Sequence, residues 1–203
     1  MTGRAEAALR RATDITVASG ALIALSPVLA AIAVAVKIDS PGPAIFRQQR
    51  IGRHGRPFTL YKFRTMHAGT TGPAVTSRGD TRVTRLGRRL RATKLDELPQ
   101  LVNVARGDMS LVGPRPEVPE YVALWAEADR HIILSVRPGI TDPETYRLRR
   151  EESLLASQAD PETYYVENLL PSKVASYARY VRHRTARDDL RVFARSVGVL
   201  VGR

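Results

Sequence analysis

The segment 15–36 reads ITVASGALIALSPVLAAIAVAV and contains no charged residue. Its 22 residues would extend roughly 33 Å as one straight helix, which is enough to cross the hydrocarbon core of a bilayer. Ser26-Pro27 interrupts the run near its middle, and a proline inside a helix removes a backbone donor and bends the chain. The segment therefore predicts a membrane helix with a break at Ser26-Pro27.

Both flanks of this run are basic. Arg10 and Arg11 precede it, and Lys37 and Arg47 follow it. The positive-inside rule places each group on the cytoplasmic side, which a hairpin satisfies and one straight span does not. We therefore interpret residues 1–40 as a re-entrant membrane hairpin. A kinked single span and a cleaved signal peptide are the alternatives, although the run exceeds the ~7–15 apolar residues of a signal peptide.

The composition bounds the rest of the chain. Of the 203 residues, 41–203 suffice for one compact cytosolic domain. The absence of cysteine excludes disulfides and cysteine-ligated metals. The formal net charge of +12 suits anionic inner-membrane lipids or phosphorylated substrates. The interleaved aromatic residues of a nucleic-acid-binding sheet are missing, so we expect no nucleic acid partner.

Local patterns predict an α+β fold that is mostly helical. Alternating strands at 44–49 and 57–66 flank a turn at 52–55 and form a small β-hairpin. A polar loop at 68–80 follows. We expect helices at 82–91, 96–105 and 119–135, a stiff loop at 112–116, and helical structure from Tyr146 onward. The amphipathic segment 172–200 packs against the core or lies at the membrane face.

Two adjacent carboxylates, Asp96 and Glu97, stand where a helix is predicted to begin, after the cations Arg91 and Lys94. Helix-start amides and nearby cations stabilise the ionised form of a carboxylate. Asp96 is therefore a candidate nucleophile or metal ligand at neutral pH. The alternative is that both acidic residues merely complement the helix dipole.

Arg115 lies between Pro114 and Pro116. Because proline fixes the backbone on either side, the guanidinium is presented at little entropic cost and is suited to clamp a phosphate. The alternative is a rigid structural loop. Further candidate cations on a strand or turn are Lys62, Arg64 and Arg137. The chain has neither of the common phosphate-binding glycine loops and no histidine-rich metal motif.

Several motifs follow one another in a fixed order. They are Ser26-Pro27, Asp39-Ser40-Pro41-Gly42-Pro43, Phe46-Arg47-Gln48-Gln49-Arg50-Ile51-Gly52, Tyr61-Lys62-Phe63-Arg64-Thr65-Met66, Leu95-Asp96-Glu97-Leu98-Pro99-Gln100-Leu101, Gly107-Asp108-Met109-Ser110-Leu111-Val112-Gly113-Pro114-Arg115-Pro116-Glu117 and Arg137-Pro138-Gly139-Ile140-Thr141. Through them the chain resembles the bacterial sugar transferases known as monotopic phosphoglycosyl transferases, from about residue 11 to 141.

The resemblance implies transfer of a sugar 1-phosphate from a UDP-sugar to a polyprenol phosphate, such as undecaprenyl phosphate, with release of UMP. It also implies a place at the cytoplasmic face of the bacterial inner membrane. The reaction would be the first membrane step in assembling a glycoconjugate such as an exopolysaccharide, capsule, O-antigen or glycoprotein glycan. Downstream glycosyltransferases are then expected partners.

The resemblance also implies roles for residues. Asp96 matches the family's nucleophile and would form a phosphosugar aspartyl intermediate. Asp96 and Glu97 would contact Mg²⁺. The phosphate-binding candidates are Arg91, Arg115, Lys62, Arg137 and Arg64, with Arg91 and Arg115 foremost.

The chain departs from many relatives after Gly139-Ile140-Thr141, where it continues Asp142-Pro143-Glu144 instead of with a Gly-Trp or Gly-Leu stretch. This departure indicates a different branch, so the resemblance does not imply which sugar is transferred. The multi-span N-terminal region of longer relatives is also missing, and we expect a minimal catalytic unit.

Two other functions compete with this interpretation. A non-catalytic basic module would bind anionic membrane or nucleic acid in a salt-sensitive way that is indifferent to Asp96 and Glu97. A hydrolase would use the two carboxylates as acid and base, but adjacent carboxylates seldom face one bond from opposite sides.

A re-entrant hairpin places Met1 and Arg203 on the same side of the membrane. Tags at both ends, tested for accessibility from the periplasm, are expected to be protected together. Labelling of the N-terminal tag alone would show a true span.

Overall fold

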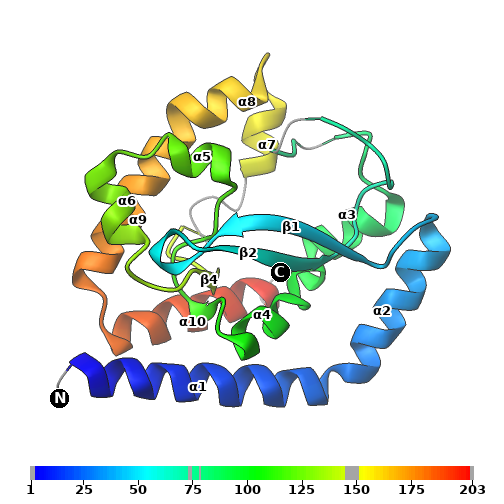
Figure 1. Ribbon diagram of the computed structural model, residues 1–203. Coiled ribbons are helices and arrows are strands. Elements are labelled where there is room, and N and C mark those ends of the chain that lie inside the picture. The colour runs from blue at the N-terminus through cyan, green and yellow to red at the C-terminus, as the bar shows by residue number, and fades with distance from the viewer. Residues whose placement is uncertain (1–2, 73–74, 78, 145–150, 202–203) are drawn as a thin grey trace.

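The computed structural model describes residues 3–72, 75–77, 79–144 and 151–201. The chain is mostly helical, with two small sheets near its centre (Figure 1). The mostly helical α+β fold and the β-hairpin are thereby confirmed.

The predicted break at Ser26-Pro27 is present. Helix α1 (Gly3–Ala24) ends at Ala24, Leu25 separates the two helices, and α2 (Ser26–Asp39) continues at an angle of 63° (Figure 1). Pro27 has no N–H to donate to the carbonyl of Ile23, and the Ser26 hydroxyl donates to that carbonyl instead, at 2.8 Å. Ser26 therefore satisfies the acceptor that the proline leaves open.

No one helix in the described part of the chain is long and apolar enough to cross a bilayer, whereas the bent α1–α2 pair taken together is. Such a bend is what a re-entrant hairpin requires. Its insertion in a membrane stays a prediction.

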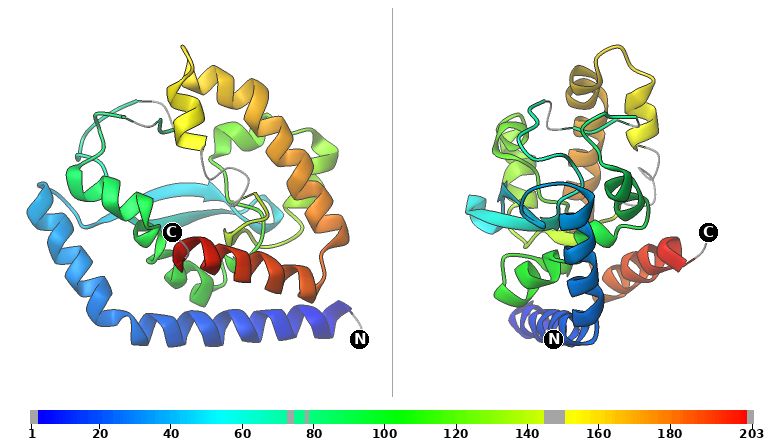
Figure 2. Two further views of the ribbon diagram at one scale, coloured as in Figure 1. Left: turned by 180° about the vertical axis from the view of Figure 1, so that it is seen from behind. Right: turned by 90° about the vertical axis from the view of Figure 1, so that its right-hand side faces the viewer.

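Helix α1 lies along one edge of the molecule and packs on α4 (Gln100–Arg106), and an ion pair between Arg10 and Asp189 joins it to the start of α10 (Ala186–Val201) (Figures 1 and 2). Arg11 donates to the carbonyls of Val104 and Ala105 at the end of α4. The buried Asp14 accepts the Leu111 amide at 3.0 Å. These contacts fix the start of the hairpin to the rest of the fold.

Strands β1 (Ile45–Ile51) and β2 (Pro57–Phe63) pair antiparallel, so the predicted hairpin is confirmed with slightly shifted ends. A 3-10 turn at Arg53–Gly55 joins them, and His54 there takes a left-handed conformation, with φ of 59°. The side chain of Asn103 in α4 forms hydrogen bonds with the backbone of Thr59 and Tyr61 in β2.

A second sheet was not predicted. Strands β3 (Ser110–Val112) and β4 (Gly139–Thr141) pair in parallel, where the sequence suggested a loop and a turn. A Cβ atom at Gly139 would lie 2.1 Å from the Gly113 amide nitrogen, so only glycine permits this approach. A strand of three residues is too short to show the alternation of apolar and polar side chains by which strands are recognised in a sequence.

Three further expectations about helices are corrected. The predicted helix 96–105 begins only at Gln100, with Pro99 as its N-cap. Segment 119–135 forms two helices, α5 (Pro119–Ala123) and α6 (Glu127–Ile133), because the chain turns to bury Trp125. Segment 172–200 also forms parts of two helices, because the backbone is extended at Arg184 and a new helix begins at Ala186.

The remaining elements are mainly helical. They are α3 (Arg85–Ala92), the 3-10 helix η2 (Leu95–Glu97), α7 (Glu151–Ala156), α8 (Pro161–Tyr164), the π-helical turn η3 (Tyr165–Leu169) and α9 (Leu170–His183). Residues 145–150, where helical structure was also expected, lie outside the described part of the chain. Helix α9 packs on α6, so this part of the amphipathic C-terminal segment faces the core.

Asn103 offers a test of the packing between α4 and β2. Its fully buried amide donates to the Thr59 carbonyl at 2.7 Å and accepts from the Tyr61 amide at 3.2 Å. Because Asn103→Ala leaves buried backbone groups without partners, we expect it to lower the free energy of unfolding by about 2–3 kcal/mol. Chemical unfolding measures the loss. Asn168→Ala, at an exposed asparagine, is the matched control, and an equal loss in both variants would contradict this account.

Candidate active site

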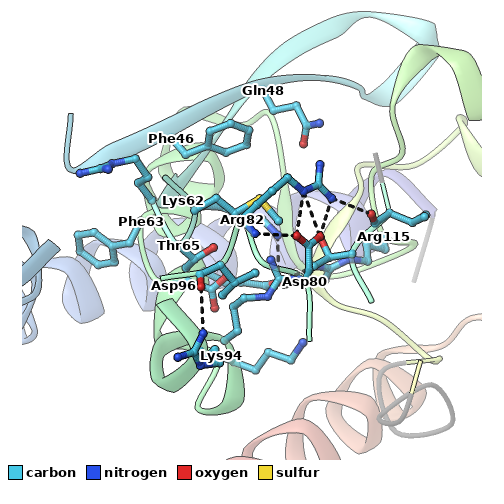
Figure 3. A pocket seen from close by; sticks show the side chains of 18 of the residues that line it. Phe46, Gln48, Lys62, Phe63, Thr65, Asp80, Arg82, Lys94, Asp96 and Arg115 are labelled. Carbon is cyan, nitrogen blue, oxygen red and sulfur yellow. Dashed lines mark hydrogen bonds and ion pairs between the residues drawn. The ribbon is translucent and has the colours of Figure 1, made fainter. Parts of the chain in front are cut away.

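A large cavity of about 2180 Å³ lies between the β-hairpin, α3 and the C-terminal helices. Figure 3 shows Lys62, Lys94, Asp96 and Arg115 among the side chains that line it. Its volume exceeds the roughly 300–1,000 Å³ of a typical small-molecule pocket. The cavity therefore has room for more than one ligand.

Asp96 and Glu97 lie in the 3-10 helix η2, which connects α3 to α4. Lys94 precedes it in a left-handed conformation, with φ of 57°, and this turns the chain inward. Both carboxylates are buried, each residue being only 7% exposed. The sequence had suggested that the pair begins a longer helix. The structure instead places both residues in a tight 3-10 turn that precedes α4.

Glu97 is held between two cations that come from distant parts of the chain. Lys62 of β2 approaches its Oε1 atom at 3.1 Å, and Arg115 of the loop after β3 donates to both carboxylate oxygens. The structure thus brings together Lys62, Glu97 and Arg115, which the sequence had proposed separately.

The pKa values of Glu97, Arg115 and Lys62 are all shifted from their ordinary values. Burial opposes ionisation of Glu97, but Arg115 and Lys62 outweigh it and hold its pKa well below the usual range. Glu97 in turn raises the pKa of Arg115 well above its ordinary value. Burial lowers the pKa of Lys62 to about 8, although Glu97 opposes the shift. At neutral pH we therefore assign one anion and two cations.

Asp96 has a different environment. Burial raises its pKa, and the negative charge of Glu97 adds to the shift, while Lys62, Lys94 and Arg91 act in the opposite direction. The sequence had suggested that helix-start amides and cations would favour its ionised form; that expectation is wrong because desolvation outweighs them. Its Oδ1 atom is buried with no hydrogen-bond partner among the described residues.

The other predicted cations occupy distinct places. Arg91, at the end of α3, lines the cavity and lowers the pKa of Asp96. Arg64 also borders the cavity, but its buried guanidinium donates to the carbonyls of Ser40 and Pro43 beyond the end of α2. Arg137 donates to the Gly107 carbonyl at 2.8 Å. The structure does not bring Arg137 to the Glu97 group.

The cavity also contains residues that the sequence did not single out. Arg50 and Glu117 border it from β1 and the loop after β3, and Tyr165 and Lys173 border it from the C-terminal helices. Glu117 was quoted within a motif, but no local pattern linked it to a position some fifty residues further along the chain. The packing of η3 and α9 brings Tyr165 and Lys173 to Glu117.

Asp96 is the described residue that offers a magnesium ion an open carboxylate oxygen in this group. Mg²⁺ usually takes one or two carboxylates and fills its shell with water and substrate phosphates. Asp96 Oδ1 is a suitable acceptor, whereas both oxygens of Glu97 already accept from cations. Within the described residues, no group of three His, Cys, Asp or Glu side chains could hold a metal. An ion here would be held by Asp96 together with substrate oxygens.

Comparisons with known proteins identify a family and several named relatives. The family model described as bacterial sugar transferase matches residues 5–203. A UDP-glucose:undecaprenyl-phosphate glucose-1-phosphate transferase of Caulobacter vibrioides is 40% identical over 205 aligned residues, covering 95% of this chain and 69% of the relative. A relative of the same name from Escherichia coli is 47% identical over 66% of this chain.

A third relative, from Aeromonas hydrophila, is a UDP-N-acetylgalactosamine-undecaprenyl-phosphate N-acetylgalactosaminephosphotransferase that is 44% identical over 66% of this chain. The chain spans only 30% of the Escherichia coli relative and 32% of the Aeromonas one. Because the family model matches residues 5–203, this chain belongs to the bacterial sugar transferase family.

Proposed function

We propose that this protein transfers a sugar 1-phosphate from a UDP-sugar to a polyprenol phosphate and releases UMP. The observation that carries the proposal is a buried aspartate with an open oxygen atom, Asp96, in a cavity that also holds two cations fixed by Glu97. Relatives named as undecaprenyl-phosphate transferases of glucose 1-phosphate and of N-acetylgalactosamine phosphate support it. Because these relatives differ in their sugar, we propose none for this chain.

The first half-reaction is an attack by a carboxylate oxygen of Asp96 on the β-phosphorus of the UDP-sugar. A P–O bond to Asp96 forms, the bridging P–O bond to the α-phosphate breaks, and UMP leaves with the bonding electrons. The sugar phosphate is then covalently attached to Asp96. Burial favours this step because a desolvated carboxylate is a stronger nucleophile than a hydrated one.

In the second half-reaction a phosphate oxygen of the lipid attacks the same phosphorus. The bond to Asp96 breaks, the carboxylate is restored, and a polyprenyl diphosphate sugar is released. Two successive displacements give ping-pong kinetics. The volume of the cavity is compatible with a donor and an acceptor that approach one aspartate.

Lys62 and Arg115 would stabilise the negative charge that develops on the transferred phosphate. Glu97 holds both cations in place, so little reorganisation is needed when the donor binds. We propose that Arg91, which lines the cavity and lowers the pKa of Asp96, binds a second phosphate. A magnesium ion on Asp96 would offset the charge of the diphosphate.

We propose a location at the cytoplasmic face of the inner membrane, where a soluble UDP-sugar meets a lipid phosphate. The bent α1–α2 pair would insert from that face and return to it. The contacts of Arg11 and Asp14 with the core would then hold the cavity at the membrane surface.

Asp96→Asn tests the nucleophile. We expect it to lower UMP release from a UDP-sugar by at least about 10³-fold, because a neutral amide cannot form the phosphoryl bond. Purified protein, Mg²⁺, a panel of UDP-sugars and a short polyprenol phosphate provide the assay. Asp80→Asn, at a carboxylate of the same cavity that pairs with Arg82 (Figure 3), is the control. Full turnover by Asp96→Asn would rule Asp96 out as nucleophile.

The pH dependence tests Lys62. The first half-reaction requires ionised Asp96 and protonated Lys62, so kcat/KM for the donor should rise with pH through the raised pKa of Asp96 and fall above about 8. In Lys62→Arg the alkaline fall should move up by more than ~2 pH units, because arginine stays charged. The acid limb should not move. An unchanged alkaline limb would exclude Lys62 as its source.

A further inference from the structure

The C-terminal helices contribute a buried charged group to the wall of the active-site cavity. The π-helical turn η3 supplies Tyr165, which is 2% exposed, and α9 supplies Lys173, which is 4% exposed. The ammonium of Lys173 contacts the Tyr165 hydroxyl at 3.1 Å and Glu151 at 3.3 Å. π-Helical turns are rare and often occur at functional sites.

This group converges on Glu117. The Tyr165 hydroxyl donates to its Oε1 atom at 2.8 Å, and the Lys173 ammonium lies 3.7 Å from the same oxygen. Arg50 of β1 donates to the other oxygen at 3.3 Å. Burial and the charge of Glu117 raise the pKa of Tyr165, so its hydroxyl stays protonated and continues to donate.

Glu117 belongs to the short loop that presents Arg115. The backbone of this loop is fixed at three carbonyls: Gly139 donates to Pro114, Arg50 to Pro116, and Ile51 to Glu117. The side chain of Glu117 is the fourth anchor, and it is the only one that reaches the C-terminal helices. Glu97 holds the Arg115 guanidinium itself, and Glu117 ties the backbone from which Arg115 extends to η3 and α9.

A core that served stability alone would not require a buried lysine and a buried glutamate at these positions. Burying a lysine and a glutamate carries a desolvation penalty that apolar side chains of the same size would avoid, so a buried ionic pair is weak support for stability alone. Such a group can instead fix the direction of its members, because hydrogen bonds depend on angle as well as on distance.

We propose that Tyr165 and Lys173 are positioning residues, which act on phosphate transfer through Glu117 and the Arg115 loop. The inference rests on the proposed function, because it assigns Arg115 to the transferred phosphate. It extends the active site into the C-terminal helices, beyond the motifs of residues 11–141.

The test compares two tyrosines of similar burial whose hydroxyls each donate to a glutamate. Tyr165→Phe removes the bond to Glu117, whereas Tyr121→Phe removes a bond to Glu162, which makes no hydrogen bond or ion pair with the Arg115 loop within the described residues. The rings pack 5.1 Å apart, so both substitutions perturb the same part of the core. Thermal unfolding of both variants measures the structural cost.

We expect Tyr165→Phe to lower kcat for UMP release about tenfold with a smaller change in donor KM, and Tyr121→Phe to change kcat less than about twofold. In an Arg115→Lys background the effect of Tyr165→Phe should shrink below about twofold, because both act through one group. Lys173→Met should behave like Tyr165→Phe, and Lys173→Arg should restore most of the rate.

A readout without turnover separates this inference from the proposed function. The order parameter of the Arg115 Nε–H group, measured by NMR, should fall in Tyr165→Phe and stay at the wild-type value in Tyr121→Phe. Equal order parameters in the two variants, or an undiminished rate effect in the Arg115→Lys background, would overturn the positioning role. A wild-type protein that releases no UMP would instead contradict the proposed function alone.

Discussion

Two adjacent carboxylates, Asp96 and Glu97, are buried in one cavity, and the rest of the site depends on how their charge is compensated. Isolated buried anions are expensive, so at least one of the pair must be matched by cations. Lys62 from β2 and Arg115 from the loop after β3 provide that match to Glu97. The β-hairpin, η2 and the loop after β3 must therefore meet at one point.

The compensation is unequal, and this separates the roles of the two residues. Glu97 stays ionised because it takes both cations, while burial and the charge of Glu97 raise the pKa of Asp96. Asp96 keeps an oxygen without a hydrogen-bond partner among the described residues, and this oxygen is free either to accept a metal ion or to attack phosphorus. Neighbouring groups whose environments push their pKa values apart commonly share catalytic work in this way.

Local signals predicted a large part of the fold. The break at Ser26-Pro27, the β-hairpin and the mostly helical remainder follow from proline chemistry and from strand and helix periodicity. The second sheet was missed because its two strands have three residues each and pair across some thirty residues. The division of segment 119–135 was missed because burial of Trp125 overrides helix propensity there.

The sequence by itself determined the family motifs, the bend of the N-terminal helices and the candidates Asp96, Glu97, Lys62 and Arg115, because each depends on residues close together in the chain. Tertiary structure alone decided which groups meet. It placed Glu97 between two distant cations, and it directed Arg64 toward the end of α2. The physical reason is that desolvation and pairing depend on distances in space, which neither composition nor periodicity encodes.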